Sequence, residues 1–139
     1  MPVARASREL LAPPEDVWQF LAEPRHLADW WPGIGAVEPD RRGLAPGARW
    51  RVRRSEASLF RKAQAEDTLV VTVGDRARRF GFELVRARLN AEVSLTPGDR
   101  RRTLVQLTVE GPLVPAFARS LPKTALTRLH DLCQTAATL

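Results

Sequence analysis

The sequence has few of the side chains that support disulfide, metal or thiol chemistry. Cys133 is its one cysteine, His26 and His130 are its two histidines, and tyrosine is absent. A single cysteine cannot form an internal disulfide, and three such scattered side chains do not suggest a zinc site. We therefore expect no metal and no cofactor, and the cysteine content favours a reducing cytoplasm.

Long apolar runs are also missing. No stretch approaches the ~20 residues that a membrane-spanning helix needs, and residues 1–10 lack the apolar core of an export signal. The sequence has no phosphate-binding loop, no dinucleotide glycine fingerprint and no serine in a nucleophile elbow. These absences predict a cytoplasmic protein without a transmembrane segment and speak against the enzymes that use those motifs.

Lysine is scarce, yet the chain is basic. Lys62 and Lys123 are the only lysines, the other basic residues are arginines, and the net charge is +6. Proteins that bind nucleic acids usually cluster such charge and interleave it with aromatic side chains. Here the arginines are spread over predicted strands and turns, and the aromatic residues occupy mostly apolar positions. Nucleic acid is therefore not expected as a partner.

Residues 11–34 hold the densest set of structural signals. Two adjacent prolines, Pro13 and Pro14, end a strand and suit the first turn of a helix. A break at Glu23–Pro24 separates two groups of apolar residues at helical spacing: Val17, Phe20 and Leu21, then Leu27, Trp30 and Trp31. This segment predicts two short helices inserted after the first strand.

Most of the remaining chain alternates between apolar and polar residues, as half-buried strands do. We expect one strand before the helices and six after them: residues 3–10, 35–40, 48–53, 64–73, 77–86, 88–96 and 103–109. Residues 55–62 are less regular and predict a loop or a frayed strand pair. Short connections between consecutive strands imply antiparallel pairing.

The last segment, residues 115–137, has an apolar stripe at helical spacing that can cover one face of the sheet. Pro122 interrupts this stripe, and an internal proline removes a hydrogen bond and kinks a helix. We therefore expect two helical pieces that meet near residues 120–122.

Residues 12–34, APPEDVWQFLAEPRHLADWWPGI, resemble the opening of the helix-grip proteins, the START/Bet v 1-like (SRPBCC) superfamily, in particular its bacterial polyketide cyclase/dehydrase or lipid-transport group. The resemblance continues in Pro46–Trp50, Leu95–Pro97, Thr103–Val105 and the C-terminal segment. It implies an α+β helix-grip fold in a single domain, residues 1–139. In such a fold a curved antiparallel sheet of about seven strands wraps around a long C-terminal helix, and two short helices follow strand 1.

Helix-grip proteins commonly keep a ligand cavity, so the resemblance implies an internal hydrophobic pocket. On the pattern alone, the same inward side chains fill the interior solidly. The predicted lining consists of inward-facing strand residues and a few helical ones: Trp31, Ile34, Trp50, Val52, Asp67, Leu69, Val71, Phe80, Phe82, Ala91, Val93, Val105, Phe117 and Leu121.

Charged residues share the inward parity at strand ends. Asp67 is one, and three arginines, Arg54, Arg78 and Arg86, are candidate anchors for an acidic or enolic ligand group. The alternative is that these charges reach solvent at the rim of the pocket. Both histidines lie on the polar sides of their helices, where surface placement is expected.

Three functions stay open at this point. The first is carriage or sequestration of a hydrophobic small molecule, such as a lipid, a polyketide-like aromatic or a quinone, by a monomer or homodimer. The second is a polyketide aromatase/cyclase, although the chain lacks the tyrosines often used for such proton transfers. The third is a protein-interaction module. No catalytic residue is identified, so whether the protein is an enzyme is left open.

Overall fold

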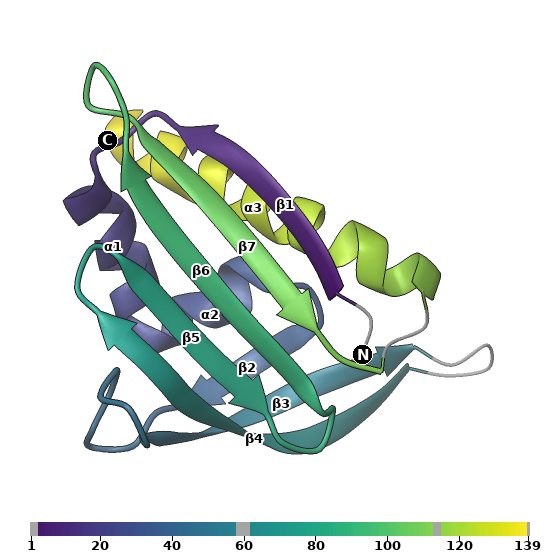
Figure 1. The fold of residues 1–139 in the computed structure, drawn as a ribbon. Coiled ribbons are helices and arrows are strands. Elements are labelled where there is room, and N and C mark those ends of the chain that lie inside the picture. Colours follow the sequence, from purple (N-terminus) through teal and green to yellow (C-terminus); the bar gives the residue numbers. More distant parts are fainter. Residues whose placement is uncertain (1–2, 58–61, 113–114, 139) are drawn as a thin grey trace.

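The computed structural model describes the backbone of residues 3–57, 62–112 and 115–138, and the side chains of residues 3–54, 65–112 and 120–135. Within these ranges the chain forms one antiparallel sheet with three α-helices on the same side of it (Figure 1). None of the helices in these described ranges is long and apolar enough to cross a membrane.

The sheet has seven strands in the order β1-β7-β6-β5-β4-β3-β2. Every neighbouring pair is antiparallel, and β1 pairs with β7. This arrangement confirms the predicted curved antiparallel sheet. The strands are β1 Val3–Leu10, β2 Ile34–Glu38, β3 Arg49–Ala57, β4 Lys62–Asp75, β5 Arg79–Leu84, β6 Leu89–Pro97 and β7 Thr103–Glu110.

Alternation along the strands sets which face is buried. In β6 and β7 every second residue is buried, from Leu89 to Leu95 and from Thr103 to Val109, and the residues between them are exposed or half-buried. The register then aligns the inward residues into rows across the sheet, and one such row contains Val71, Phe82, Ala91 and Val109. Because side chains alternate with a period of two, this register gives the sheet one apolar face.

The segment predicted as a loop or a frayed strand pair is largely a strand pair. β3 and β4 stay in register from Arg49↔Val70 to Ala57↔Lys62. The two strands are therefore longer than predicted, β3 at its C-terminal end and β4 at its N-terminal end. Residues 58–61, also part of the predicted loop, lie outside the described residues.

The inserted helices follow β1 as predicted. α1 spans Pro14–Ala22, a short 3₁₀ helix η1 spans Pro24–His26, and α2 spans Leu27–Trp30. Glu23 separates the first two by adopting an extended backbone, and its carboxylate accepts a hydrogen bond from the backbone N–H of Arg25. η1 continues directly into α2. The second predicted helix therefore consists of a 3₁₀ turn followed by a single α-helical turn.

The C-terminal helix α3 spans Pro115–Thr138 without interruption, so the prediction of two separate pieces is wrong. Pro122 lies inside the helix and is itself buried. A proline in this position costs one backbone hydrogen bond, about 3 kcal/mol. The buried stripe that continues through Leu121, Ala125 and Leu129 offsets this cost by holding the helix against the sheet.

α3 packs mainly along β1, and it also contacts β7, α2 and α1 (Figure 1). A hydrogen bond joins β1 and α3: Arg8 Nη1 donates to Thr127 Oγ1 at 3.1 Å. α2 contacts β2, the strand at the opposite edge of the sheet from β1. The helices therefore enclose the apolar face of the sheet from two sides.

Candidate functional site

A chain of five aromatic side chains crosses the interior, and we call it the aromatic row: Trp50, Phe80, Phe82, Trp31 and Trp30. Trp50 and Phe80 are stacked, with centroids 6.0 Å apart and planes at 24°. The ring centroids of Phe80 and Phe82 are 5.5 Å apart. Those of Trp31 and Phe82 are 5.0 Å apart, and these two rings meet edge-on. The row runs from the middle of the sheet to the end of α2, so it bridges the strands and the inserted helix.

Local structure fixes both ends of the aromatic row. Trp50 Nε1 donates a 2.7 Å hydrogen bond to the carbonyl of Gly43 in the β2–β3 loop. That loop is organised by Asp40, whose carboxylate accepts backbone N–H bonds from Arg49 and Arg42. These bonds, led by the one from Arg49, lower the pKa of Asp40. At the other end, Trp31 caps α2 and its backbone N–H bonds to the carbonyl of Leu27.

Almost the whole predicted lining is buried. Phe117 is the exception because its side chain lies outside the described residues. The other predicted positions are at most 5% exposed: Trp31, Ile34, Trp50, Val52, Asp67, Leu69, Val71, Phe80, Phe82, Ala91, Val93, Val105 and Leu121. These side chains therefore face the interior, and their role as a ligand lining stays a prediction.

Asp67 is buried as a structural carboxylate. Its Oδ1 accepts backbone N–H bonds from Thr68 and Arg86, both at 2.7 Å. Its Oδ2 accepts from the Nε of Arg54 at 2.9 Å and from the backbone N–H of Ala87 at 3.1 Å. Four donors match the acceptor capacity of a carboxylate, so Asp67 has no lone pair left for a ligand proton. It ties the β5–β6 turn to β3 and β4.

The three candidate arginine anchors separate in the structure. Arg54 lies beside Asp67 with its side chain only 18% exposed. Arg78 and Arg86 are exposed, one before and one after β5. Only the backbone of Arg86 contacts Asp67. Of the two placements considered for Arg78 and Arg86, exposure to solvent is the one found, because turns at the two ends of β5 carry both side chains outward.

The two histidines differ in exposure, since the side chain of His26 is 38% exposed and that of His130 only 19%. The ring of His26 packs 5.4 Å from that of Phe20 and bonds to Asp29 at 3.1 Å. His130 lies 3.3 Å from the exposed carboxylate of Asp131. Among the described residues, no group of three His, Cys, Asp or Glu side chains could hold a metal ion.

Sequence reasoning did not single out Thr103, which is fully buried and whose hydroxyl donates a hydrogen bond to the carbonyl of Ala12. It also missed Arg8, which is half-buried on β1. Arg8 lies on the same face of β1 as Ala4, Ala6 and Leu10 and pairs with Val105, so the alternation itself was the signal. Its guanidinium is held at the β1–α3 interface by Thr127.

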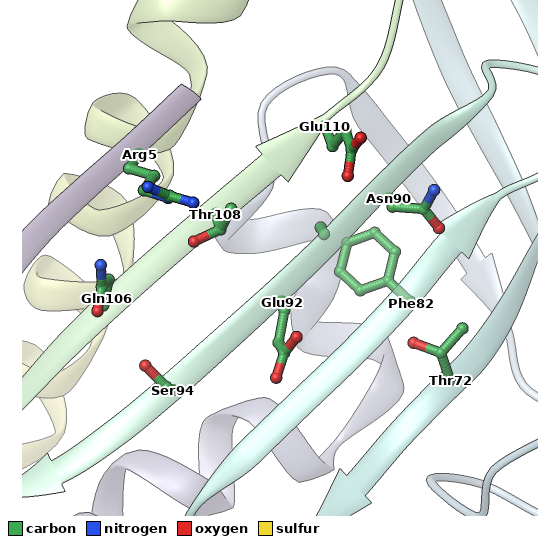
Figure 2. A pocket seen from close by; sticks show the side chains of 10 residues that line it. Arg5, Thr72, Phe82, Asn90, Glu92, Ser94, Gln106, Thr108 and Glu110 are labelled. Carbon is green, nitrogen blue, oxygen red and sulfur yellow. The ribbon is translucent and has the colours of Figure 1, made fainter. Parts of the chain in front are cut away.

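A groove of about 580 Å³ lies on the opposite, outer face of the sheet (Figure 2). Its side chains are almost all polar: Arg5, Thr72, Asn90, Glu92, Ser94, Gln106, Thr108 and Glu110. Gly81 also faces outward here, since a Cβ at this position would meet Thr72 Oγ1 at 2.8 Å. A groove with this polar lining is not the predicted apolar pocket.

Cys133 is the buried thiol of α3, and its titration gives a stability test. Burial, followed by the nearby Asp16 carboxylate, raises the pKa of Cys133 to about 11. The pKa of a thiol in an unfolded chain is about 8.5. Rising pH therefore deprotonates the unfolded state first and lowers the free energy of unfolding. We expect Cys133→Ala to remove up to about 1.4 kcal/mol per pH unit of this decline above about pH 8.5.

Urea unfolding of both proteins at several alkaline pH values measures the effect. The wild-type curve should fall more steeply than that of Cys133→Ala, and the two should run parallel near neutral pH. Parallel curves over the whole alkaline range would contradict the burial of the thiol.

The family model described as "Polyketide cyclase / dehydrase and lipid transport" matches residues 1–135. The chain belongs to the polyketide cyclase/dehydrase and lipid-transport family. This match covers every strand and nearly all of α3, so membership rests on the whole fold. A comparison with curated protein sequences finds no match.

Solved structures show the same fold for this family member. A START superfamily protein from Mycobacterium smegmatis has a TM-score of 0.72 at 12% identity, covering 96% of this chain and 98% of that one. Protein NE0264 from Nitrosomonas europaea has a TM-score of 0.70 at 19% identity, covering 99% and 97%. A norcoclaurine synthase variant from Thalictrum flavum, in complex with a transition-state analogue, has a TM-score of 0.68 at 15% identity. The match covers 98% of this chain and 96% of that one. At these identities the likeness concerns the fold alone.

Proposed function

We propose that the protein binds a hydrophobic small molecule between the apolar face of its sheet and α3. The observation that carries this proposal is the aromatic row, a continuous run of buried rings on the concave side. Sites for small molecules are mostly lined by apolar and aromatic side chains with a few polar groups. Membership of a family whose description includes lipid transport supports the same assignment.

Aromatic guests fit this lining better than saturated chains. Neighbouring rings in the row meet both stacked, as Trp50 and Phe80 do, and edge-on, as Trp31 and Phe82 do. Such ring pairs gain about 0.5–1.5 kcal/mol beyond simple burial. A planar ligand such as a polyketide-like aromatic or a quinone gains the same contacts by lying against the row.

The polar groups favour binding over catalysis. Asp67 is saturated by four donors, and Arg54 is its partner. Arg8 is held by Thr127, and each histidine ring contacts an exposed carboxylate of its own or an adjoining helix. A cyclase needs a group that accepts and returns a proton next to its substrate. The described inward polar side chains are already engaged in structural contacts, which supports a carrier role.

Two measurements test the proposal. Native mass spectrometry of the purified protein should show a bound small molecule that denaturation releases. A graded series, Ala91→Val and Ala91→Phe, should then reduce binding of naphthalene, detected by tryptophan quenching, because Ala91 faces the interior beside Phe82. Ala36→Phe is the matched control, since Ala36 is exposed on β2.

The same series reports whether the interior is hollow. In a hollow interior the larger side chains occupy free space, so stability is kept while naphthalene binding falls. In a solidly packed interior overpacking costs about 1–3 kcal/mol and the wild type binds no naphthalene. This second result would refute the proposed function.

A further inference from the structure

A second hollow lies at the end of the molecule where β1 passes into α1, and we call it the Arg100 crevice. Its volume is about 640 Å³. Its walls are the β1–α1 connection, one side of α1 and the β6–β7 turn, and Cys133 of α3 lies at its base. The crevice is separate from the aromatic row, so its role does not depend on the function proposed above.

Two adjacent arginines form the basic wall of the crevice. Arg100 and Arg101 have φ values of +54° and +60°, which non-glycine residues adopt at a cost. The turn that carries them is closed by a 2.8 Å bond from the Gly98 N–H to the Arg102 carbonyl. Arg102 is anchored to Glu9 at 2.7 Å. Within the described part of the chain, Arg100 and Arg101 have no ion-pair or hydrogen-bond partner of their own.

The opposite wall is apolar. Leu11 is 49% exposed, and Phe20 is half-buried on α1. The Cys133 thiol keeps its proton at neutral pH, since its pKa is about 11, so the base carries no charge. Asp16 on α1 contributes the one carboxylate of the crevice lining. The lining therefore combines two positive charges, one negative charge and an exposed apolar surface.

We propose that the Arg100 crevice binds an amphiphile with an anionic headgroup, such as an alkyl phosphate or a fatty carboxylate. The two guanidinium groups present planar donors that suit phosphate and carboxylate oxygens. The alkyl chain lies along Leu11 and Phe20, where it covers apolar surface that is otherwise in water. The net positive charge of the lining favours an anion over a neutral headgroup.

Monodecyl phosphate, kept below its micellar concentration, is the probe. Isothermal titration calorimetry should show binding that weakens about tenfold in Arg100→Ala/Arg101→Ala, as expected for losing two partly exposed ion pairs. The matched control is Arg41→Ala/Arg42→Ala, which removes two adjacent exposed arginines from the β2–β3 loop and should change the affinity by less than about twofold. Asp16→Asn should bind the probe more tightly than wild type, because it removes the opposing charge.

The single cysteine locates the bound molecule. Saturating decyl phosphate should slow alkylation of Cys133 by N-ethylmaleimide at alkaline pH, and this protection should disappear in the Arg100/Arg101 variant. Inorganic phosphate and decanol separate the two halves of the ligand: each should bind much more weakly than decyl phosphate. If the double alanine variant does not fold, Arg100→Gly/Arg101→Gly replaces it, since glycine accepts positive φ.

Two results would overturn the proposal. One is a wild-type affinity for decyl phosphate in the Arg100/Arg101 variant. The other is unchanged Cys133 alkylation at saturation, which would place the probe elsewhere, for example along the aromatic row. Failure of naphthalene binding affects only the function proposed above, so the two proposals fail separately.

Discussion

Replacing Asp67 by alanine should destabilise the protein by about 3–5 kcal/mol, the cost of removing one member of a buried ion pair. The side chain of Asp67 is fully buried, and that of its partner Arg54 is only 18% exposed. Alanine leaves the Arg54 guanidinium without its carboxylate and removes the acceptor of the Arg86 and Ala87 N–H groups. The β5–β6 turn then loses its link to β3 and β4.

Asp67→Asn separates charge from shape. The amide keeps one acceptor oxygen but turns a donor toward groups that are themselves donors, so we expect a smaller loss, about 1–3 kcal/mol. The matched control is Glu66→Gln, because Glu66 is the exposed neighbour of Asp67 on β4 and should change stability by less than about 0.5 kcal/mol. Urea unfolding measures the free energy of unfolding of the three variants, Asp67→Ala, Asp67→Asn and Glu66→Gln, against the wild type. A loss below about 1 kcal/mol in Asp67→Ala would show that the carboxylate is dispensable for stability and free to act on a ligand.

This test bears on the function because Asp67 is the most buried acid among the described residues. A catalytic acid or base needs a lone pair or proton that can reach the substrate. The four hydrogen bonds to Asp67 leave neither. A large stability loss in Asp67→Ala therefore supports a carrier, since the residue would then be explained by the fold.

The strand order was within reach of the sequence because alternation and short turns carry most of the information. Residues 105–109 alternate strictly, and β7 spans Thr103–Glu110, close to the predicted strand 103–109. The inserted helices were signalled by the Pro13–Pro14 pair and by two apolar groups at helical spacing. In these segments local preference and tertiary packing point to the same structure.

The continuous C-terminal helix could not be foreseen, because local preference and packing disagree there. Pro122 disfavours a helix locally, and the contacts of α3 with β1 and β7 favour a continuous helix. The direction of two candidate anchors was left open by the sequence for a related reason. Parity places Arg78 and Arg86 on the inner face, but each lies in a turn, where alternation no longer determines direction.

The bonding of Asp67 was also beyond the sequence. Parity correctly predicts that it faces inward, but its partners come from a turn about twenty residues later in the chain, Arg86 and Ala87. Their backbone N–H groups carry no side-chain signature that a sequence pattern can display. A buried acid can therefore be located from parity, whereas its role follows from the donors that surround it.

Replacing Phe82 by alanine should cost about 3–5 kcal/mol and open a space in the middle of the aromatic row. Phe82 is fully buried, and its ring contacts those of Trp31 at 5.0 Å and Phe80 at 5.5 Å. Phe20→Ala is the matched control, because Phe20 is only half-buried and contacts the ring of His26 at the surface. Its loss should be clearly smaller, and urea unfolding compares the two.

The same variant tests whether the row is a place where an aromatic guest can reside. An apolar space of this kind stays dry and accepts a small aromatic molecule. Benzene should therefore raise the unfolding free energy of Phe82→Ala in proportion to RT ln(1 + [L]/Kd), and Phe20→Ala should show no gain beyond that of the wild type. A stabilisation of wild type itself would reveal a hollow that already exists beside Phe82. If benzene stabilises neither the wild type nor Phe82→Ala, the aromatic row is a packed core rather than a ligand site, because even a freshly opened space beside Trp31 and Phe80 would then reject an aromatic ring.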